Sequence, residues 1–330
     1  MGRTTYARGM RLRWSDVVYL AVLALALAIN APGWFQYAYA WWGRAHVDRL
    51  PEAAAPGPGD RVLVLAPHPD DEVLCCGGLI RRALERGAEV HIVWMTSGDG
   101  FEMDELVLNR GRHVTPADLR ALGERRMDEA RAAARALGVP RANLYFLGYP
   151  DRGLRPLFLE HYYVPYRSPY THLESVAYPG TLSPGAPYTG EALERDLEEV
   201  FERVDPTRAY LPSPRDAHPD HQATSYFAQR VAGRRGQVDR LRYWIVHGGL
   251  EWPLPKGYHP ALALEPAPRG RGLDWRRFAL TPAEEEAKHA ATLAHKSQLD
   301  VLSRFMLAFI RTNELFSTTP FPEPGSYPAP

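Results

Sequence analysis

The sequence predicts an α/β protein with a Rossmann-like, mostly parallel doubly wound sheet and an N-terminal transmembrane helix. From residue 61 onward, short apolar runs alternate with amphipathic helical patterns, the order from which parallel sheets are built. Clusters of histidine and acid directly follow two of the predicted strands. Near the amino end, residues 17–29 form an unbroken apolar run.

The composition is that of a folded globular protein. Of the 330 residues, 45% are hydrophobic and 24% are charged, which excludes a disordered chain, a coiled coil and a multi-span transporter. The 39 basic and 39 acidic side chains cancel, so the chain has no basic field for nucleic acid and we expect no nucleic-acid partner. The oligomeric state is left open.

The amino end predicts a single-pass membrane anchor. Aromatic residues at 30–42 extend the apolar run to the length of a spanning helix and resemble an interfacial belt. Preceding arginines place the amino end in the cytoplasm and the remaining chain outside the cell membrane; they are Arg3, Arg8, Arg11 and Arg13. A cleaved signal peptide, giving a secreted protein, and a buried core helix are the alternatives. The dipeptide at 32–33, Pro-Gly, predicts a kink or an early helix end.

The chain divides into an arginine-rich tail and anchor at 1–42, a flexible Pro/Ala/Gly linker at 43–60, a catalytic domain at 61–315 and a Pro-rich tail at 316–330. Predicted strands cover 61–66, 90–96, 143–147, 208–211 and 241–247, and predicted helices cover 73–86, 117–137, 190–204, 222–231 and 282–312. Residues 155–188, rich in proline and tyrosine, interrupt the alternation and are predicted to form a lid or substrate wall. The adjacent Cys75 and Cys76 are predicted to be buried, reduced thiols.

Two short phrases carry the chemistry. Residues 66–72, Ala-Pro-His-Pro-Asp-Asp-Glu, follow the first strand, and residues 216–221, Asp-Ala-His-Pro-Asp-His, follow the strand at 208–211. The carboxyl edge of a parallel sheet is where open α/β folds build their sites. His68 and Asp71 lie three apart across a turn, and one further imidazole would complete a two-His, one-carboxylate set that suits Zn²⁺, or Fe²⁺. Helix capping is the alternative for either phrase alone, but capping requires no histidine.

The paired phrases resemble those of the PIG-L/LmbE-like N-deacetylase family. Further matching text surrounds them: Cys76-Gly77-Gly78, Thr96-Ser97-Gly98-Asp99, Arg126 with Glu129, Lys288, and His295-Lys296-Ser297-Gln298. The resemblance runs from about residue 60 to about residue 300 and leaves the predicted anchor outside it.

The resemblance implies a zinc ion held by His68, Asp71 and His221. It implies that Asp70 is the general base, and that His218 stabilises the oxyanion as an imidazolium and protonates the leaving amine while Asp220 orients it. Candidate substrate-binding residues are Arg126, Asp151 and His247. Relatives acting on mycothiol precursors have a tyrosine where this chain has Asp216, which argues against that specificity.

The predicted function is therefore zinc-dependent removal of the N-acetyl group from an N-acetylglucosaminyl or related sugar glycoconjugate. An amidase for a small soluble acylated amine is the alternative within the enzyme class. A non-catalytic sugar-binding membrane protein is the alternative from another class, although a binder has no use for Asp70. A nucleotide-binding dehydrogenase is disfavoured because no glycine-rich fingerprint follows the first strand.

Overall fold

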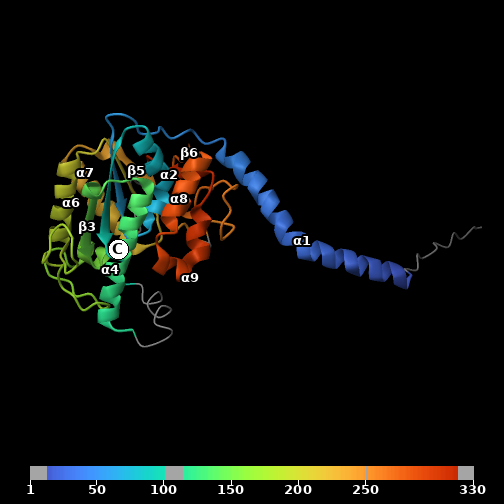
Figure 1. Cartoon of the computed structure of the whole chain (residues 1–330), viewed down its shortest axis with the longest axis horizontal. Helices are drawn as coiled ribbons and strands as arrows, with labels where there is room; N and C mark the ends of the chain where they lie inside the picture. The colour runs from blue at the N-terminus through green and yellow to red at the C-terminus, as the bar shows by residue number, and fades with distance from the viewer. Residues whose placement is uncertain (1–12, 101–113, 250–251, 319–330) are drawn as a thin grey trace, which may run out of the picture.

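A five-stranded parallel sheet forms the centre of the protein, in a computed structural model that describes residues 13–100, 114–249 and 252–318 (Figure 1). Its strand order is β3-β2-β1-β4-β5, and every neighbouring pair is parallel. The strands are β1 Arg61–Ala66, β2 Glu89–Thr96, β3 Leu144–Tyr149, β4 Arg208–Pro212 and β5 Leu241–Trp244. The predicted α/β fold with a mostly parallel sheet is confirmed.

After Arg61, strand β1 is apolar from Val62 to Ala66, because both of its faces are covered. Val62 and Val64 pack into one hydrophobic core, whereas Leu63 and Leu65 pack into a second core on the opposite face. This alternation follows the two-residue period of a strand, and burial on both faces explains the continuous apolar run.

Helices cover the sheet on both faces (Figure 1). On one face lie α2 Asp71–Glu85, α4 Pro116–Leu137 and α8 Pro282–Thr292, and on the other lie α5 Leu154–Leu159, α6 Gly190–Val204 and α7 Pro219–Arg234. Threonine hydroxyls accept from backbone amides at the starts of α4, α6 and α8, which fixes where these helices begin. Short 3₁₀-helices cover Arg141–Asn143, Val238–Arg240, Pro268–Gly270 and Leu307–Phe309.

After β1, the chain adds β2 and then β3 on one side of β1. It later adds β4 and then β5 on the other side. The carboxyl ends of β1 and β4 therefore flank the point where the winding direction reverses. Open α/β sheets bind their ligands in the crevice at such a point.

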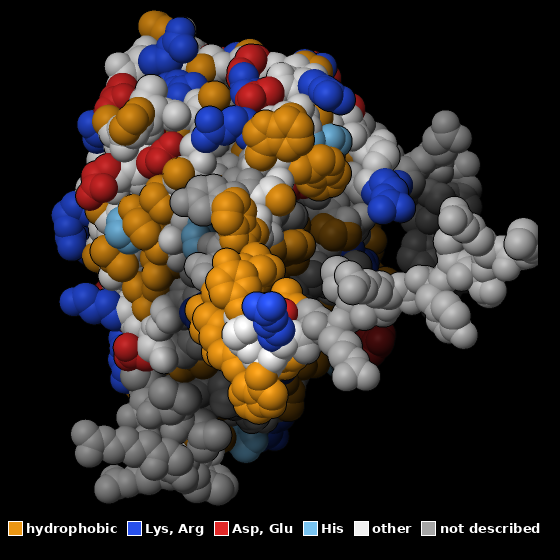
Figure 2. Space-filling view, turned by 90° about the vertical axis from the view of Figure 1, so that its right-hand side faces the viewer, with side chains coloured by type: hydrophobic (Ala, Val, Ile, Leu, Met, Phe, Trp, Pro, Cys, Tyr) orange, Lys and Arg blue, Asp and Glu red, His pale blue; other side chains and the backbone are white. Residues whose placement is uncertain are grey.

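Helix α1, Trp14–Val47, projects away from the sheet domain (Figure 1). It runs through Pro32 and Gly33, so the predicted early end is wrong. Hydrophobic side chains gather on its surface (Figure 2), among them Trp14, Leu25 and Trp41. Within the described residues no helix has the length and apolar character required to cross a membrane.

The predicted transmembrane helix, and the membrane partner inferred from it, are therefore not supported. Of the arginines used to orient the chain, Arg3, Arg8 and Arg11 lie outside the described residues. The extracytoplasmic location stays a prediction.

The segment predicted as a flexible linker is partly docked onto the domain. Val47 is buried, and Leu50 and Ala53 pack against the larger core. The amide of Ala53 donates to the carbonyl of Arg277 at 2.7 Å. The first part of residues 43–60 therefore belongs to the folded body.

The single helix predicted over residues 282–312 is two helices, α8 and α9 Lys296–Met306. The break occurs where the buried side chain of His295 turns inward and its Nε2 lies 2.9 Å from Glu72 Oε1. After α9 the chain forms β7, Asn313–Phe316, which pairs antiparallel with β6, Arg276–Ala279. This two-stranded sheet has no counterpart in the sequence prediction.

Residues 155–188 include most of α5 and are otherwise irregular, and several of their side chains are buried, among them Val176, Tyr178 and Tyr188. They pack against the sheet domain, and their role as a lid or substrate wall stays a prediction.

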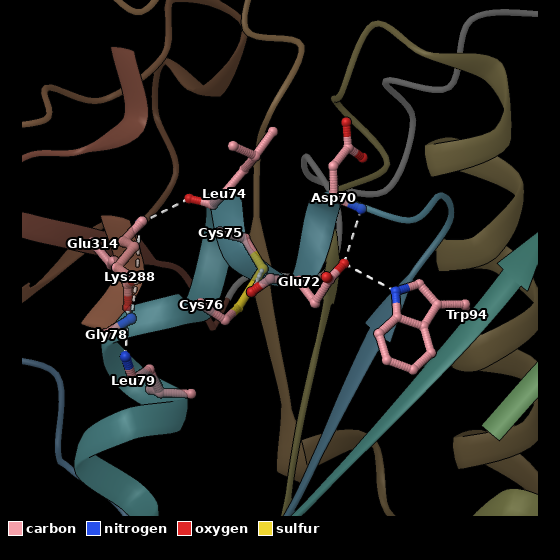
Figure 3. The surroundings of a disulfide bond; sticks show 10 residues. All are labelled: Asp70, Glu72, Leu74, Cys75, Cys76, Gly78, Leu79, Trp94, Lys288 and Glu314. Carbon is pink, nitrogen blue, oxygen red and sulfur yellow. Dashed lines mark hydrogen bonds and ion pairs between the residues drawn. A yellow bond between two sulfur atoms is a disulfide. The ribbon is translucent and has the colours of Figure 1, made fainter. Parts of the chain in front are cut away.

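A buried ion pair holds α2 against the C-terminal part of the chain (Figure 3). Glu314 accepts hydrogen bonds from the amides of Gly78 and Leu79 at 2.8 and 2.9 Å, and from Lys288 Nζ at 2.8 Å. Lys288 also donates to the carbonyl of Leu74 at 2.9 Å. Both charged side chains are fully buried, so each depends on the other for compensation.

Beside this pair, the sulfur atoms of Cys75 and Cys76 form a disulfide between adjacent residues (Figure 3). The prediction of two reduced thiols is therefore wrong.

Replacing Lys288 tests the buried pair. We expect Lys288→Met to lower the free energy of unfolding by about 3–5 kcal/mol, because the Glu314 carboxylate would stay buried without its cation. Adding Glu314→Gln should recover part of that loss. Denaturant titration measures both, with Arg81→Ala on the exposed side of α2 as the control, expected to cost about 0.5 kcal/mol. Equal effects of the Lys288 and Arg81 changes would contradict this account.

Candidate active site

The two histidine-rich phrases meet at the carboxyl ends of neighbouring strands. His68 follows β1 in the turn that leads into α2, and Asp71 is the first residue of that helix. His218 is the N-cap of α7, and His221 lies in its first turn. Because β1 and β4 pair directly, the residues that follow them face one another.

Asp71 joins the two phrases. Its Oδ2 lies 3.3 Å from His68 Nδ1 and 3.3 Å from His221 Nε2. Burial favours the protonated carboxyl, but the neighbouring His221 and His68 outweigh it and hold the pKa of Asp71 well below its usual value. Burial favours the neutral ring of His221, but the charges of Asp216 and then Asp71 outweigh it and raise the pKa of His221 to about 10.

The donors suit a divalent metal ion. Among the described residues, three sets have ligand atoms within 4.8 Å of one another: His68/His218/His221, Asp216/His221/His247 and His68/Asp151/Asp220. The predicted set of His68, Asp71 and His221 is not one of them, although Asp71 contacts both rings. Neither nitrogen of the fully buried His221 ring makes a hydrogen bond within the described chain, although each lies near a carboxylate oxygen. Imidazole and carboxylate in this arrangement fit Zn²⁺ or Fe²⁺.

Asp220 does not orient His218 through its carboxylate. Its Oδ2 lies 3.2 Å from His68 Nε2 and accepts from the amide of Arg152 at 2.6 Å, and its Oδ1 accepts from the amide of Leu154 at 3.1 Å. Instead, the backbone amide of Asp220 donates to His218 Nδ1 at 3.2 Å. That contact leaves Nε2 of a neutral His218 as the protonated nitrogen.

His218 is neutral near pH 7. Burial, followed by the charges of His68, His221 and His247, lowers the pKa of His218 to about 2. The expectation of an imidazolium at this position does not fit this environment, because a further positive charge would stand among neighbouring imidazoles.

Asp70 has a strained backbone and a shifted pKa. Its φ of 139° is in the range that side-chain-bearing residues rarely adopt, which costs about 1–3 kcal/mol and is typical of functional positions. Burial, and then the charge of Asp71, raise the pKa of Asp70 to about 7. Gln298 Nε2 donates to Asp70 Oδ2, and the amide of Asp70 donates to Glu72 Oε2 at 3.0 Å (Figure 3).

The three residues predicted to bind substrate lie around one cavity of about 180 Å³. Arg126 is held by its donations to the carbonyls of Gly98 and Pro69 at 2.7 and 3.1 Å. Asp151 Oδ1 lies 3.2 Å from His68 Nε2, so this acid also belongs to the charged cluster. The cavity is lined by His68, Asp70, Asp71, Arg126, Asp151, Arg152, His218, Val246, His247, Gln298, Leu302 and Phe305.

Sequence reasoning missed two supporting residues. Asp216 is fully buried, lies 3.2 Å from His221 Nδ1, and accepts from the amides of Val246 and His247 at 2.8 and 3.0 Å. Its place two residues before His218 was the available signal. Gln298 stands in the matching phrase at 295–298, but only the fold shows that it reaches Asp70.

A family model described as PIG-L, GlcNAc-PI de-N-acetylase, matches residues 63–232. The chain is 29% identical over 235 residues to a Mycobacterium leprae protein named 1D-myo-inositol 2-acetamido-2-deoxy-alpha-D-glucopyranoside deacetylase, covering 68% of this chain and 69% of that protein. A Streptomyces avermitilis protein of the same name is 26% identical over 276 residues, covering 74% and 84%.

Among solved structures, the fold is similar to that of the A40926 pseudoaglycone deacetylase, with a TM-score of 0.51, 21% identity and coverage of 78% and 96%. A triple mutant of a deacetylase from the teicoplanin biosynthetic pathway gives a TM-score of 0.50 at 19% identity, also covering 78% and 96%.

Asp99, beside this cavity, predicts a pH dependence of stability. Burial, and then the charge of Asp151, raise the pKa of Asp99 to about 7 although Tyr178 donates to it. The folded protein therefore keeps a proton that the unfolded chain releases between about pH 4 and pH 7, and the stability contributed by this group falls as pH rises through that window. We expect Asp99→Asn to gain stability relative to the wild type between pH 5 and pH 8.

Denaturant unfolding at both pH values measures this difference. The exposed Asp128→Asn is the control and should show no such gain. A constant difference between Asp99→Asn and the wild type at the two pH values would disprove the assignment.

Proposed function

Because the chain belongs to the PIG-L family of de-N-acetylases, we propose that it is a metal-dependent hydrolase that removes the acetyl group from an N-acetylated sugar. The observation that carries this proposal is the convergence of His68, Asp70, Asp71 and His218 around one cavity, with the buried His221 in contact with Asp71. A pure binding protein would not require a strained carboxylate such as Asp70 beside these donors.

For the substrate, we propose an N-acetylglucosaminyl group on a glycoconjugate. Curated relatives are named as deacetylases of a 2-acetamido-2-deoxy-glucopyranoside, which supports this class. Arg126 and His247 line the cavity and would bind polar groups of the sugar. The ring of His247 stacks on that of Phe305. Together they give the cavity an apolar surface from Phe305 and a polar group from His247, which suits a sugar ring.

We assign His68, Asp71 and His221 as the metal ligands and Zn²⁺ as the metal. When bound, the metal would lower the pKa of a water molecule and polarise the acetyl carbonyl. Asp216 would hold His221 in place through Nδ1.

The remaining steps belong to the side chains. Asp70 accepts a proton from the attacking water while the water oxygen bonds to the acetyl carbon. The neutral His218 donates a hydrogen bond from Nε2 to the carbonyl oxygen as negative charge develops there. The carbon–nitrogen bond then breaks, and Asp70 returns its proton to the leaving amine, which releases acetate and the free amino sugar. Asp70 suits this second role better than His218, because Asp70 has just taken the proton of the water, whereas the lowered pKa of His218 keeps that ring neutral and a neutral imidazole is a very weak acid.

Replacing Asp70 tests the base. With N-acetylglucosamine glycosides as substrates, we expect Asp70→Asn to lower kcat for acetate release by about 10²–10⁴-fold, since the amide cannot accept the proton. Asp128→Asn, an exposed acid on α4, is the control and should retain full activity. Acetate release by the Asp70 variant at the wild-type rate would refute the assignment.

Metal removal tests the ligand set. We expect the full chain to bind about one Zn²⁺ tightly, to lose activity and thermal stability on chelation, and to regain both when Zn²⁺ is added back. His221→Ala should lose the bound metal, whereas His46→Ala, an exposed histidine on α1, should keep it. Metal analysis and thermal unfolding measure both. Full activity in the metal-free protein would exclude the proposed chemistry.

A further inference from the structure

The residue that contacts the proposed base comes from the C-terminal part of the chain, beyond the residues that the family model matches. Gln298, in the first turn of α9, donates from Nε2 to Asp70 Oδ2. We propose that Gln298 is the positioning residue that holds the Asp70 carboxylate in its reactive orientation. This inference rests on the proposed function, in which Asp70 accepts a proton.

The start of helix α9 is fixed at the site by contacts of two residues that directly precede Gln298, namely His295 and Ser297. His295 Nε2 lies 2.9 Å from Glu72 Oε1, and the other oxygen of Glu72 accepts from Trp94 Nε1 at 2.9 Å and from the amide of Asp70 at 3.0 Å (Figure 3). The carboxylate of Glu72 thus connects His295, at the break before α9, with Trp94 of β2 and with the backbone of Asp70. All of these contacts are buried or partly buried, so water does not weaken them.

A second acidic residue anchors the same helix turn. The amide and hydroxyl of Ser297 donate to the two oxygens of Glu129 at 2.9 and 2.7 Å. With the start of α9 held through both His295 and Ser297, the Gln298 side chain reaches Asp70 from one fixed position. It is 1% exposed, so it has little freedom to leave.

The chemistry of the pair determines which way the amide faces. An ionised carboxylate only accepts hydrogen bonds, so the NH₂ group of Gln298 must face Asp70. Gln298 Oε1 is then buried, and it has no hydrogen-bond partner among the described residues. Leaving a buried acceptor unsatisfied costs about 1–3 kcal/mol, a cost that an apolar side chain of similar length would avoid. Packing alone therefore does not account for glutamine here, whereas a donor to Asp70 does.

The hydrogen bond from Gln298 gives the two carboxylate oxygens of Asp70 different roles. Oδ2 is engaged by Gln298, which leaves Oδ1 to accept the proton of a water in the cavity that Asp70 lines. The strained backbone of Asp70 fixes the direction of its Cα–Cβ bond. The hydrogen bond from Gln298 then fixes the rotation of the carboxylate group about its last bond. Without that contact the carboxylate could turn about its last bond and would face the water less often.

A double-mutant cycle tests this role in the full, metal-loaded chain. We expect Gln298→Met to lower kcat for acetate release by about 10–100-fold, the usual effect of losing a residue that orients a reacting group, with KM nearly unchanged. In the Asp70→Asn background, where the base is already absent, the same change should have little further effect. Gln298→Leu serves as a second variant should the methionine variant fold poorly.

Asp300→Asn is the matched control, because it changes an exposed side chain of the same helix without touching Asp70. It should keep kcat near the wild-type value, and metal content should be equal in all variants. Equal losses of kcat from Gln298→Met in both backgrounds, or from Asp300→Asn and Gln298→Met, would overturn the positioning role. A wild-type protein that releases no acetate would instead overturn the proposed function, and this role with it.

Discussion

The carboxylate of Asp71 lies between two buried imidazoles, and the arrangement of the other site residues depends on this contact. A carboxylate loses its hydration when it is buried, so it requires partners that compensate for this loss. For Asp71 these partners are His68 and His221. Each histidine then faces a further carboxylate on its other side, Asp216 beside His221 and Asp220 beside His68. The charges therefore form an alternating chain, and the pairing of β1 with β4 keeps its two halves at the right distance.

The parts of the fold that follow from local pattern could be predicted from the sequence. The alternating burial of β1 and the apolar face of α6 are visible in the residues themselves, and α6 begins and ends at the predicted residues. The break before α9 was not predictable in this way. The helical pattern continues through residue 295, and His295 leaves it only to meet Glu72, a partner 223 residues away.

The candidate site shows the same division. The histidine and aspartate phrases predicted which strand ends would meet, because sequence spacing and sheet geometry are enough for that. Spacing failed for Asp220, which was expected to hold His218 through its carboxylate, because the start of α7 turns that carboxylate toward His68 instead. The charge of His218 also depends on neighbouring rings that only the folded chain assembles.

The contact between Asp70 and Gln298 joins residues 228 positions apart, and Glu314 of β7, which pairs with Lys288, lies still further along the chain. During synthesis, the first motif leaves the ribosome long before the helix that completes its surroundings. Until then, the nascent chain carries the half-formed edge of a parallel sheet, with the buried acids of the first phrase open to water. Parallel sheets with such distant contacts fold slowly and are prone to aggregate on the way. The enzyme thus becomes competent only when nearly all of its chain has been made, so an incomplete product would be inactive rather than partly active.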